Sequence, residues 1–149
     1  SIGLLTQLKQ LRIARGPFGG TIPTEIGNCV SLTGFLFRNA GLVGTLPSEM
    51  SKLASLTSLD VRDNFLTGQL PAELGDLPAI SLFDVSGNQF NGTIPISYTN
   101  WPDGMTAIRL DGNAFDAGTV EETFCTRNNT AEQLQYACGL ECTCCTNCD

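Results

Sequence analysis

The fold of this chain is decided by the stretch Leu53–Pro71, which reads LASLTSLDVRDNFLTGQLP. The pattern of this stretch repeats every 24 residues. It consists of regularly spaced apolar residues, one asparagine, one glycine and a final Leu-Pro pair. The pattern occupies the segments Ile2–Glu25, Ile26–Glu49, Met50–Glu73 and a fourth that begins at Leu74. A fixed period of this length indicates a solenoid, because one such repeat cannot bury its apolar edge alone and stacks on its neighbour.

Each repeat contains two apolar residues separated by a single residue. Two side chains at this spacing point to the same face of a β-strand. We therefore predict five short strands side by side in a parallel sheet. Their core pairs are Leu11/Ile13, Phe35/Phe37, Leu59/Val61, Phe83/Val85 and Ile108/Leu110. A second apolar column follows the strands and is also expected in the interior, at Phe18, Leu42, Leu66, Phe90 and Phe115.

Two further columns predict the turns of each repeat. Asparagine follows the strand at Asn64, Asn88 and Asn113, where a buried amide can bind backbone groups that a turn leaves unpaired. The first two repeats carry Gly16 and Ala40 there instead. In three repeats the conserved spacing places a glutamate two residues after a proline, which favours a short helical turn.

The motif LxxLxxLxLxxNxLxGxIP, as it stands in Leu53–Pro71, resembles the plant-type subfamily of leucine-rich repeat proteins over roughly residues 2–118. The strings GTIPTEIG (residues 20–27) and CTCCTNC (residues 142–148) are most similar to secreted leucine-rich repeat proteins of algae. The resemblance implies an α/β-type leucine-rich repeat solenoid of about five 24-residue repeats. It places a short parallel β-sheet on the concave face and irregular or short helical structure on the convex side. It also implies binding rather than catalysis, without naming a ligand.

The repeat pattern ends before the chain does. The spacing from Phe83 to Ile108 is 25 residues, and the Gly-x-Ile-Pro segment of the fifth repeat is altered. We therefore predict one continuous domain made of a solenoid over residues 1–120 and a cysteine-rich C-terminal cap over residues 121–149. Trp101 is expected to seal the side of the solenoid.

Six of the seven cysteines crowd into the predicted cap, at Cys125, Cys138, Cys142, Cys144, Cys145 and Cys148. They predict three disulfides and an oxidising, secreted or extracellular setting, with zinc binding by the Cys142–Cys148 thiolates as the alternative. The seventh, Cys29, falls in a leucine column and is expected to be buried and unpaired, with an intermolecular disulfide as its alternative. The sequons at Asn91 and Asn128 predict glycosylation, in agreement with secretion.

Composition narrows the range of functions. The net charge of −7 argues against a nucleic acid partner, and no apolar run is long enough to predict a membrane span. The absence of histidine removes the commonest general base and all zinc sites that need imidazole. We expect no cofactor, no metal and no enzymatic activity. Asp60 and Asp84, in one column of neighbouring strands, are the only paired carboxylates that suggest acid–base chemistry on a glycan.

Positive charge gathers on the predicted concave face of this acidic chain. Six of the eight basic residues fall on that face, but only four of the fifteen acidic ones. We predict a ligand-binding face for an anionic group, since arginine pairs well with carboxylate and sulfate. The candidate residues are Lys9, Arg12, Arg15, Leu36, Arg38 and Arg62. The alternative is that the arginines pair with aspartates of adjacent strands, such as Arg62 with Asp60 or Asp84.

These patterns lead to a secreted, non-enzymatic recognition module that binds a protein or an anionic polysaccharide on its concave face. One alternative is a structural subunit of an extracellular matrix or filament, because the first repeat leaves Leu4, Leu5 and Leu8 uncovered. That edge is also explained if residues upstream of Ser1 are missing. A receptor ectodomain or a hydrolase inhibitor is a further alternative. Ice binding is suggested by the column Thr21, Thr45 and Thr93, which Gln69 interrupts.

Overall fold

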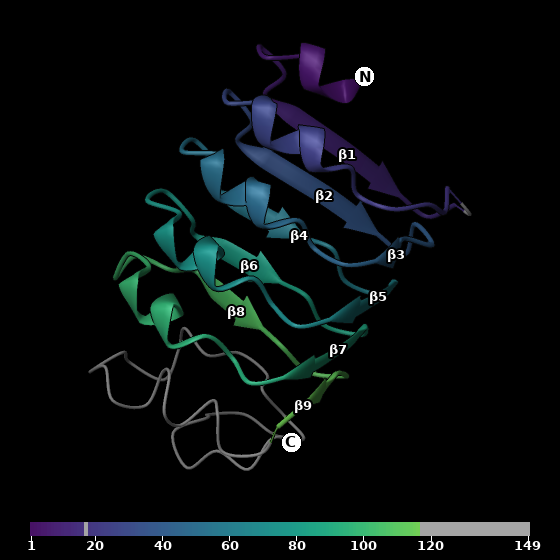
Figure 1. The fold of residues 1–149 in the computed structure, drawn as a ribbon, viewed down its shortest axis with the longest axis vertical. Helices are drawn as coiled ribbons and strands as arrows, with labels where there is room; N and C mark the ends of the chain where they lie inside the picture. Colours follow the sequence, from purple (N-terminus) through teal and green to yellow (C-terminus); the bar gives the residue numbers. More distant parts are fainter. Residues whose placement is uncertain (17, 117–149) are drawn as a thin grey trace.

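Five parallel strands form the main sheet of the protein. The computed structural model describes residues 1–16 and 18–116 of the 149-residue chain. The strands lie in the order β1 (Gln10–Ala14), β2 (Gly34–Arg38), β4 (Ser58–Asp60), β6 (Leu82–Asp84) and β8 (Ala107–Arg109). Leu11, Phe35, Leu59, Phe83 and Ile108 are in register across it. The predicted parallel sheet is therefore confirmed, and Figure 1 shows its strands stacked along the length of the solenoid.

A second parallel sheet of shorter strands was not predicted. Its strands are β3 (Val43–Gly44), β5 (Phe65–Gly68), β7 (Gln89–Gly92) and β9 (Ala114–Phe115), in that order. They form a separate column in Figure 1. Gly44, Gly68 and Gly92 end three of them with positive φ angles of 83°, 80° and 73°. The pairing of these strands depends on backbone geometry rather than on alternating side chains, so the apolar pattern did not reveal it.

The side opposite the main sheet carries short 3-10 helices. They are η1 (Ile2–Leu4), η2 (Thr24–Asn28), η3 (Ser48–Lys52), η4 (Ala72–Asp76) and η5 (Ile96–Asn100). The helices η2, η3 and η4 each follow a proline as predicted, and η5 follows Pro95 without having been predicted. Gly27 and Gly75 let successive helices stack closely. A Cβ at these positions would lie 2.4 Å from the Glu49 carbonyl oxygen and 2.5 Å from that of Ser97. Over the part of the chain described, no helix is long and apolar enough to span a membrane.

The interior is a continuous apolar column, most completely buried in the third and fourth repeats. Leu56, Leu59, Val61 and Leu66 are fully buried there. Trp101 is also buried, as predicted. Its Nε1 donates to the Leu74 carbonyl at 2.8 Å, and its ring stacks on that of Tyr98 with centroids 4.2 Å apart.

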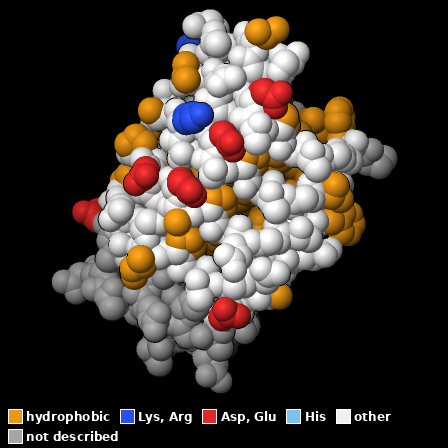
Figure 2. Space-filling model, in the orientation of Figure 1, with side chains coloured by type: hydrophobic (Ala, Val, Ile, Leu, Met, Phe, Trp, Pro, Cys, Tyr) orange, Lys and Arg blue, Asp and Glu red, His pale blue; other side chains and the backbone are white. Residues whose placement is uncertain are grey.

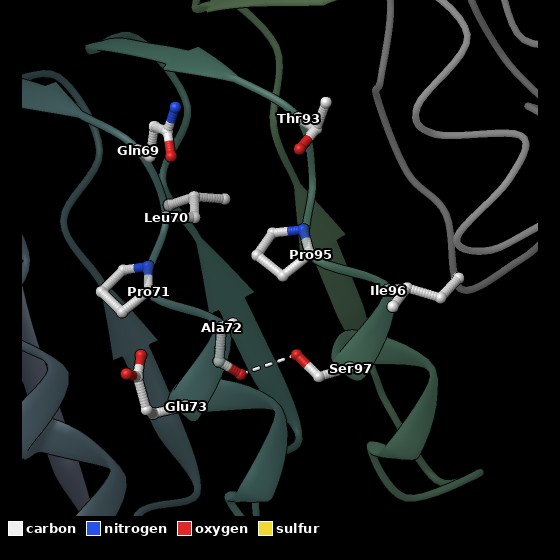
Figure 3. Close-up of a pocket in the computed structure, with 9 residues that line it drawn as sticks. All are labelled: Gln69, Leu70, Pro71, Ala72, Glu73, Thr93, Pro95, Ile96 and Ser97. Carbon is white, nitrogen blue, oxygen red and sulfur yellow. Dashed lines mark hydrogen bonds between the residues drawn. The ribbon is translucent and has the colours of Figure 1, made fainter.

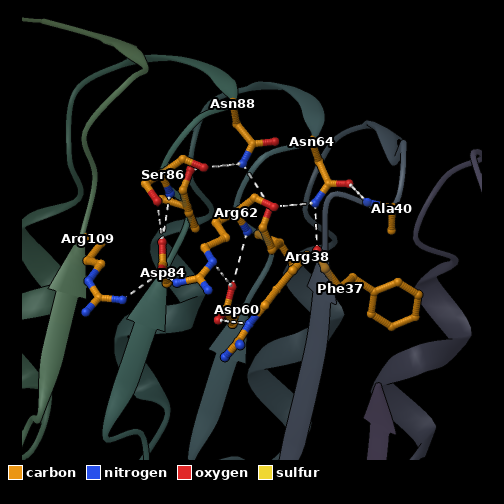
Figure 4. Close-up of polar contacts among 12 residues, drawn as sticks. Phe37, Arg38, Ala40, Asp60, Arg62, Asn64, Asp84, Ser86, Asn88 and Arg109 are labelled. Atoms are coloured by element: carbon orange, nitrogen blue, oxygen red, sulfur yellow. Dashed lines mark hydrogen bonds and ion pairs between the residues drawn. The ribbon is translucent and has the colours of Figure 1, made fainter. Parts of the chain in front are cut away.

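The asparagine ladder is confirmed. Asn64 Oδ1 accepts hydrogen bonds from the backbone amides of Ala40 and Leu42, both at 3.0 Å. Its Nδ2 donates to the carbonyls of Phe37 and Val61, both at 2.7 Å (Figure 4). Asn88 and Asn113 repeat this arrangement one and two turns of the solenoid further on. Each amide therefore joins two neighbouring repeats at the point where the strand ends.

The apolar residues of the first repeat are less buried than predicted. Phe18 was expected to be buried, but 71% of it is exposed. Its amide donates to the carbonyl of Gly16 at 2.8 Å, a tight turn in a segment that has no ladder asparagine to hold it. Leu8, Leu11 and Ile13 are only partly buried. The prediction for Phe18 was wrong because the turn, rather than the apolar spacing, determines its direction.

Cys29 is a free and fully buried thiol, as predicted. Its Sγ lies 3.4 Å from the carbonyl oxygen of Ile2, and burial raises its pKa. A thiol with a raised pKa and no exposure is unreactive, so Cys29 fills space in the core.

Candidate functional site

The outward side chains of the main sheet form three rows, which we call the sheet face. The strand register places one residue of each strand in each row. The lower row contains Gln10, Gly34, Ser58, Leu82 and Ala107. The central row contains Arg12, Leu36, Asp60, Asp84 and Arg109. The upper row, at and just beyond the strand ends, contains Ala14, Arg38, Arg62, Ser86 and Asp111.

Asp60 and Asp84 lie in the central row but are buried beneath arginine side chains. Arg38 Nε donates to Asp60 Oδ2 at 2.6 Å, and Arg62 Nε lies 4.0 Å from Asp60 Oδ1. Arg62 Nη1 and Arg109 Nη1 lie 3.5 Å and 3.2 Å from Asp84 Oδ2 (Figure 4). The predicted alternative of pairing between adjacent strands is thus confirmed for Arg62, and it also holds for Arg38.

Ser86 completes the surroundings of Asp84. Its hydroxyl and its backbone amide both donate to Asp84 Oδ1, at 2.6 Å and 3.1 Å. Both oxygens of the buried carboxylate therefore have partners within the protein. Asp60 and Asp84 point at arginines and at Ser86 instead of presenting a carboxylate pair to solvent, so the arrangement suits structural ion pairing better than acid–base chemistry on a glycan.

The basic residues of the first strand are arranged differently. Lys9, Arg12 and Arg15 are exposed, and no ion pair to any of them occurs within residues 1–16 and 18–116. Arg15 has a positive φ of 59°, a left-handed conformation that is uncommon for a residue with a side chain. The structure therefore divides the predicted cationic binding residues into exposed cations on and beside β1, and the cations Arg38 and Arg62 of the following repeats, which are paired with buried aspartates.

Leu36 lies in its predicted row, but only 8% of it is exposed. It shares a small hollow of about 80 Å³ with Arg12, Ile13, Ala14 and Arg38. Leu36 therefore faces outward as expected but offers little surface, and its role in binding stays a prediction.

A larger hollow adjoins this one at the upper edge of the sheet face. It has a volume of about 390 Å³ and is lined by Ala14, Arg15, Arg38, Asn39, Arg62 and Asp63. Three of the predicted binding residues, Arg15, Arg38 and Arg62, meet here. We call this space the arginine hollow. Lys9 and Leu36 do not line it.

Asn39 and Asp63 are residues of this hollow that the sequence analysis did not select. Together with Arg15 they form a turn column with positive φ angles of 48°, 57° and 59° respectively, which continues as Gly87 and Gly112 in later repeats. The sequence contains a signal for this column, because Gly87 and Gly112 occupy it in the later repeats and glycine is typical of a left-handed turn. A polar or charged residue in place of such a glycine is held at an unusual backbone conformation, which is a reason to consider it as a site residue.

Asp111 ends the upper row at the other side of the sheet face. Partial burial and the nearby Asp84 carboxylate raise its pKa, while its own backbone hydrogen bond and Arg109 act in the opposite direction. The C-terminal side of the sheet face is therefore less favourable for an anion than the β1 side.

The side with the 3-10 helices has the opposite charge. Glu25, Glu49 and Glu73 lie in the first turns of η2, η3 and η4, and Lys52 lies in the last turn of η3. Figure 2 shows acidic side chains spread along this side, with few basic ones. The charge segregation predicted from the sequence is present in the structure.

A third hollow lies between the proline turns of the third and fourth repeats (Figure 3). It has a volume of about 570 Å³ and includes Gln69, Glu73, Thr93 and Ile96, and the Ser97 hydroxyl donates to the Ala72 carbonyl at 2.6 Å across it. Its charged group is a carboxylate, so it offers nothing to an anion. In the predicted threonine column, Thr21, Thr45 and Thr93 are exposed, and so is Gln69.

Several predicted sites fall elsewhere. Asn91 is exposed on β7, and its glycosylation stays a prediction. Asn128 and the six predicted disulfide cysteines lie outside the described residues. Within residues 1–16 and 18–116, no cluster of acidic or sulfur side chains suits a metal ion.

Comparisons with known proteins agree with this geometry. The family described as Leucine Rich Repeat matches residues 55–77. No curated protein matched the chain. The ectodomain of the Arabidopsis thaliana receptor kinase GASSHO1/SCHENGEN3, solved in complex with CASPARIAN STRIP INTEGRITY FACTOR 2, is 35% identical with a TM-score of 0.72, over 76% of this chain and 14% of the receptor chain.

Two further structures have similar folds. The Arabidopsis receptor kinase HAESA, in complex with the peptide hormone IDA and the co-receptor SERK1, is 26% identical with a TM-score of 0.71, over 74% of this chain and 18% of that one. A plant ice-binding protein is 28% identical with a TM-score of 0.64, over 72% of this chain and 34% of that one. The chain thus spans at most about a third of the length of these relatives. It has the leucine-rich repeat fold, in the form found in the ectodomains of plant receptors.

Proposed function

We propose that this chain is a non-enzymatic recognition module of an extracellular protein and that it binds a polypeptide partner on the sheet face. The observation that carries the proposal is the group of exposed cations on and beside β1, namely Lys9, Arg12 and Arg15, which have no ion pair within residues 1–16 and 18–116 and lie next to a hollow on an acidic protein. Similar solved structures in complex with peptide ligands support it. The regular strands offer a rigid surface on which an extended segment can lie across several repeats.

Selection from a displayed library of random twelve-residue peptides, with the full-length chain as bait, tests this proposal. Ser58→Trp places a large ring in the middle of the sheet face, and Ala54→Trp places the same ring on an exposed turn outside it. We expect selected peptides to bind Ser58→Trp at least about tenfold more weakly than wild type and Ala54→Trp with little change. Peptides that bind both variants like wild type would contradict the proposal.

An anionic polysaccharide is the other ligand class for the same face. Polygalacturonate tests it, because its carboxylates would contact the same cations. Binding that Ser58→Trp weakens, together with failure of the peptide selection, would assign the sheet face to a polysaccharide. Both ligand classes agree with the proposed secretion and with a glycan at Asn91.

Exposed apolar side chains in the first repeat favour a second candidate, a structural subunit that assembles through this repeat. Leu4 is 80% exposed, Leu5 52% and Phe18 71%, while the first strand is only partly buried. Light scattering at increasing concentration measures this directly. Growth of the particle mass that Leu4→Ser and Phe18→Ser together abolish would support assembly, and a constant monomer mass would exclude it.

The exposed threonines favour a third candidate, ice binding. Thr21, Thr45 and Thr93 repeat at solenoid spacing, and a plant ice-binding protein has a similar fold. Thermal hysteresis of the purified chain decides this candidate. Activity that Thr45→Tyr removes would support it, whereas freezing at the melting point would exclude it.

A further inference from the structure

Three exposed apolar side chains lie on the side of the solenoid that carries the second sheet. Phe18 is 71% exposed, Val43 on β3 42% and Phe65 on β5 57%. Val43 and Phe65 are register partners, and the Val43 amide donates to the carbonyl of Gly20, two residues after Phe18. Figure 2 shows hydrophobic side chains along the right-hand edge of the molecule, where Figure 1 places β3 and β5. We call these three side chains the side patch.

The side patch carries no charge. The segments 18–21, 42–45 and 65–69 contain no charged residue, although the protein has a net charge of −7. In later repeats the positions equivalent to Val43 hold Asn91 and Asp116. A surface that contacts its own copy brings equal charges together, so an uncharged patch is where two copies of an acidic protein can meet.

An apolar cavity of about 80 Å³ lies between the first and second repeats. Two exposed residues line it on its open side, Thr21 and Pro23, and its walls include Leu11, Ile22, Phe37 and Leu42.

This cavity is the place that the ring of Phe18 leaves empty. The other members of its column, Leu42, Leu66, Phe90 and Phe115, are buried. The rings of Phe90 and Phe115 lie parallel with centroids 6.4 Å apart, so members of the column pack on their neighbours. An inward Phe18 would therefore pack on Leu42, which lines the cavity.

The turn of the first repeat directs the Phe18 ring away from its own cavity. The Phe18 amide donates to the Gly16 carbonyl at 2.8 Å, and Gly19 and Gly20 follow with positive φ angles of 64° and 80°. An inward ring would require this turn to reorganise. The cavity has roughly half the volume of about 150 Å³ that encloses benzene, so it admits the edge of one ring from its open side.

We propose that two copies of this chain form a symmetric dimer through the side patch, in which Phe18 of each copy inserts into the cavity of the other. Phe18 and the cavity residue Thr21 are three residues apart, so ring and cavity belong to one contact surface, as two-fold symmetry requires. The dimer goes beyond the proposed function and does not use the sheet face. It also closes at two copies, unlike an open assembly.

The exposed apolar area fits a weak dimer. The side patch exposes roughly 300 Å² in each copy, so a pair buries roughly 600 Å² of it. The smallest standard interfaces bury about 1,200 Å² in total, of which about 65% is apolar in homodimers. The side patch supplies most of that apolar area, and we expect dissociation at micromolar concentrations.

Sedimentation equilibrium of the full-length chain at rising concentration measures the dimer. Phe18→Ser removes the ring, and Leu42→Phe fills the cavity with a residue that the same column accepts at Phe90 and Phe115. Each should weaken the dimer at least about tenfold. Leu4→Ser is the matched control, because it removes a similarly exposed side chain outside the side patch and should leave the dimer unchanged.

A mixture of the two variants tests the reciprocal contact. The Phe18→Ser copy keeps its cavity and the Leu42→Phe copy keeps its ring, so a mixed pair has one intact contact and neither pure variant has any. We expect mixed pairs at concentrations where both pure variants are monomers.

The proposal is overturned if the wild type stays monomeric, if its mass grows beyond two copies, or if Leu4→Ser weakens the dimer as much as Phe18→Ser. It is also overturned if the mixture stays monomeric or if Leu42→Phe has no effect. Thermal melts check the fold of each variant. Should Leu42→Phe be unfolded, Thr21→Trp replaces it in both tests, because it covers the cavity from an exposed position.

Discussion

The first repeat and the third repeat use the same columns for different purposes. In the third repeat, Leu59 is fully buried, Asn64 ties two repeats together, and Asp60 in the central row is buried and paired with Arg38 and Arg62. In the first repeat, Leu11 is only partly buried, Gly16 replaces the asparagine, and Arg12 in the central row is exposed. A column position that stabilises the middle of the solenoid is therefore available for recognition at its β1 end.

The largest expected difference between the two repeats is the loss in free energy of unfolding when a core leucine is replaced by alanine. Leu59→Ala is expected to lower the free energy of unfolding by about 3 kcal/mol, because it leaves a cavity in a packed interior. Leu11→Ala, in the same row of the sheet, should cost only about 1 kcal/mol, since its side chain already meets solvent. Urea unfolding of both variants checks this, and equal losses would show that the β1 end is as well packed as the middle.

The next largest difference in free energy of unfolding is expected between a buried aspartate, Asp84, and an exposed one, Asp63. Asp84→Asn is expected to cost about 2 kcal/mol, because a buried neutral amide replaces the carboxylate that pairs with Arg62 and Arg109 and accepts from Ser86. The arginines are partly exposed, so solvent limits the loss. Asp63→Asn should change the free energy of unfolding by less than about 0.5 kcal/mol. A similar loss in free energy of unfolding for both substitutions would contradict the distinction between Asp84, which is buried and paired with arginines, and Asp63, which is exposed.

Asp111, at the other end of the upper row, should make the free energy of unfolding depend on pH. Its raised pKa means that the folded state binds a proton more readily than the unfolded state, so ionisation of Asp111 opposes folding above its folded pKa. Asp111→Asn should therefore stabilise the protein slightly at pH 7, by less than about 0.5 kcal/mol. The advantage should shrink as the pH falls and disappear below about pH 3, where Asp111 is largely protonated in both states. Unfolding curves at pH 7 and at about pH 2.5 measure it, and a gain that persists at the lower pH would refute the assignment.

Arg15 should show the smallest effect on stability. Arg15→Asn loses no ion pair within the described residues and suits the left-handed turn, so the free energy of unfolding should stay within about 0.5 kcal/mol of wild type. Arg38→Gln is the comparison, because it removes the nearest cation of the buried Asp60 and should be clearly destabilising. Equal stability of these two variants would mean that Asp60 needs no partner.

Most of the fold could be predicted from the sequence, because each apolar residue of a repeat has a counterpart 24 residues away. The column Leu59, Phe83 and Ile108 and the ladder of Asn64 and Asn88 depend only on this spacing. Phe18 could not be predicted, since a turn of glycines without an asparagine lets the backbone direct the ring outward.

The site was predictable only in part. The sequence placed Arg12, Arg38 and Arg62 on one face, because strand alternation decides the face of a side chain. It could not show which arginine is anchored, since Arg38 and Arg62 reach Asp60 and Asp84 through long side chains across neighbouring strands. Asp63 and Asn39 were missed because their role depends on the left-handed backbone of a turn.

The most direct test of recognition by the sheet face is a map of amide chemical shifts in the full-length chain on addition of a library-selected peptide. The account predicts changes along β1, β2 and β4 and at the turn residues Arg15, Asn39 and Asp63, with η2, η3 and η4 unaffected. Changes confined to the 3-10 helices, with the sheet face unchanged, would contradict it.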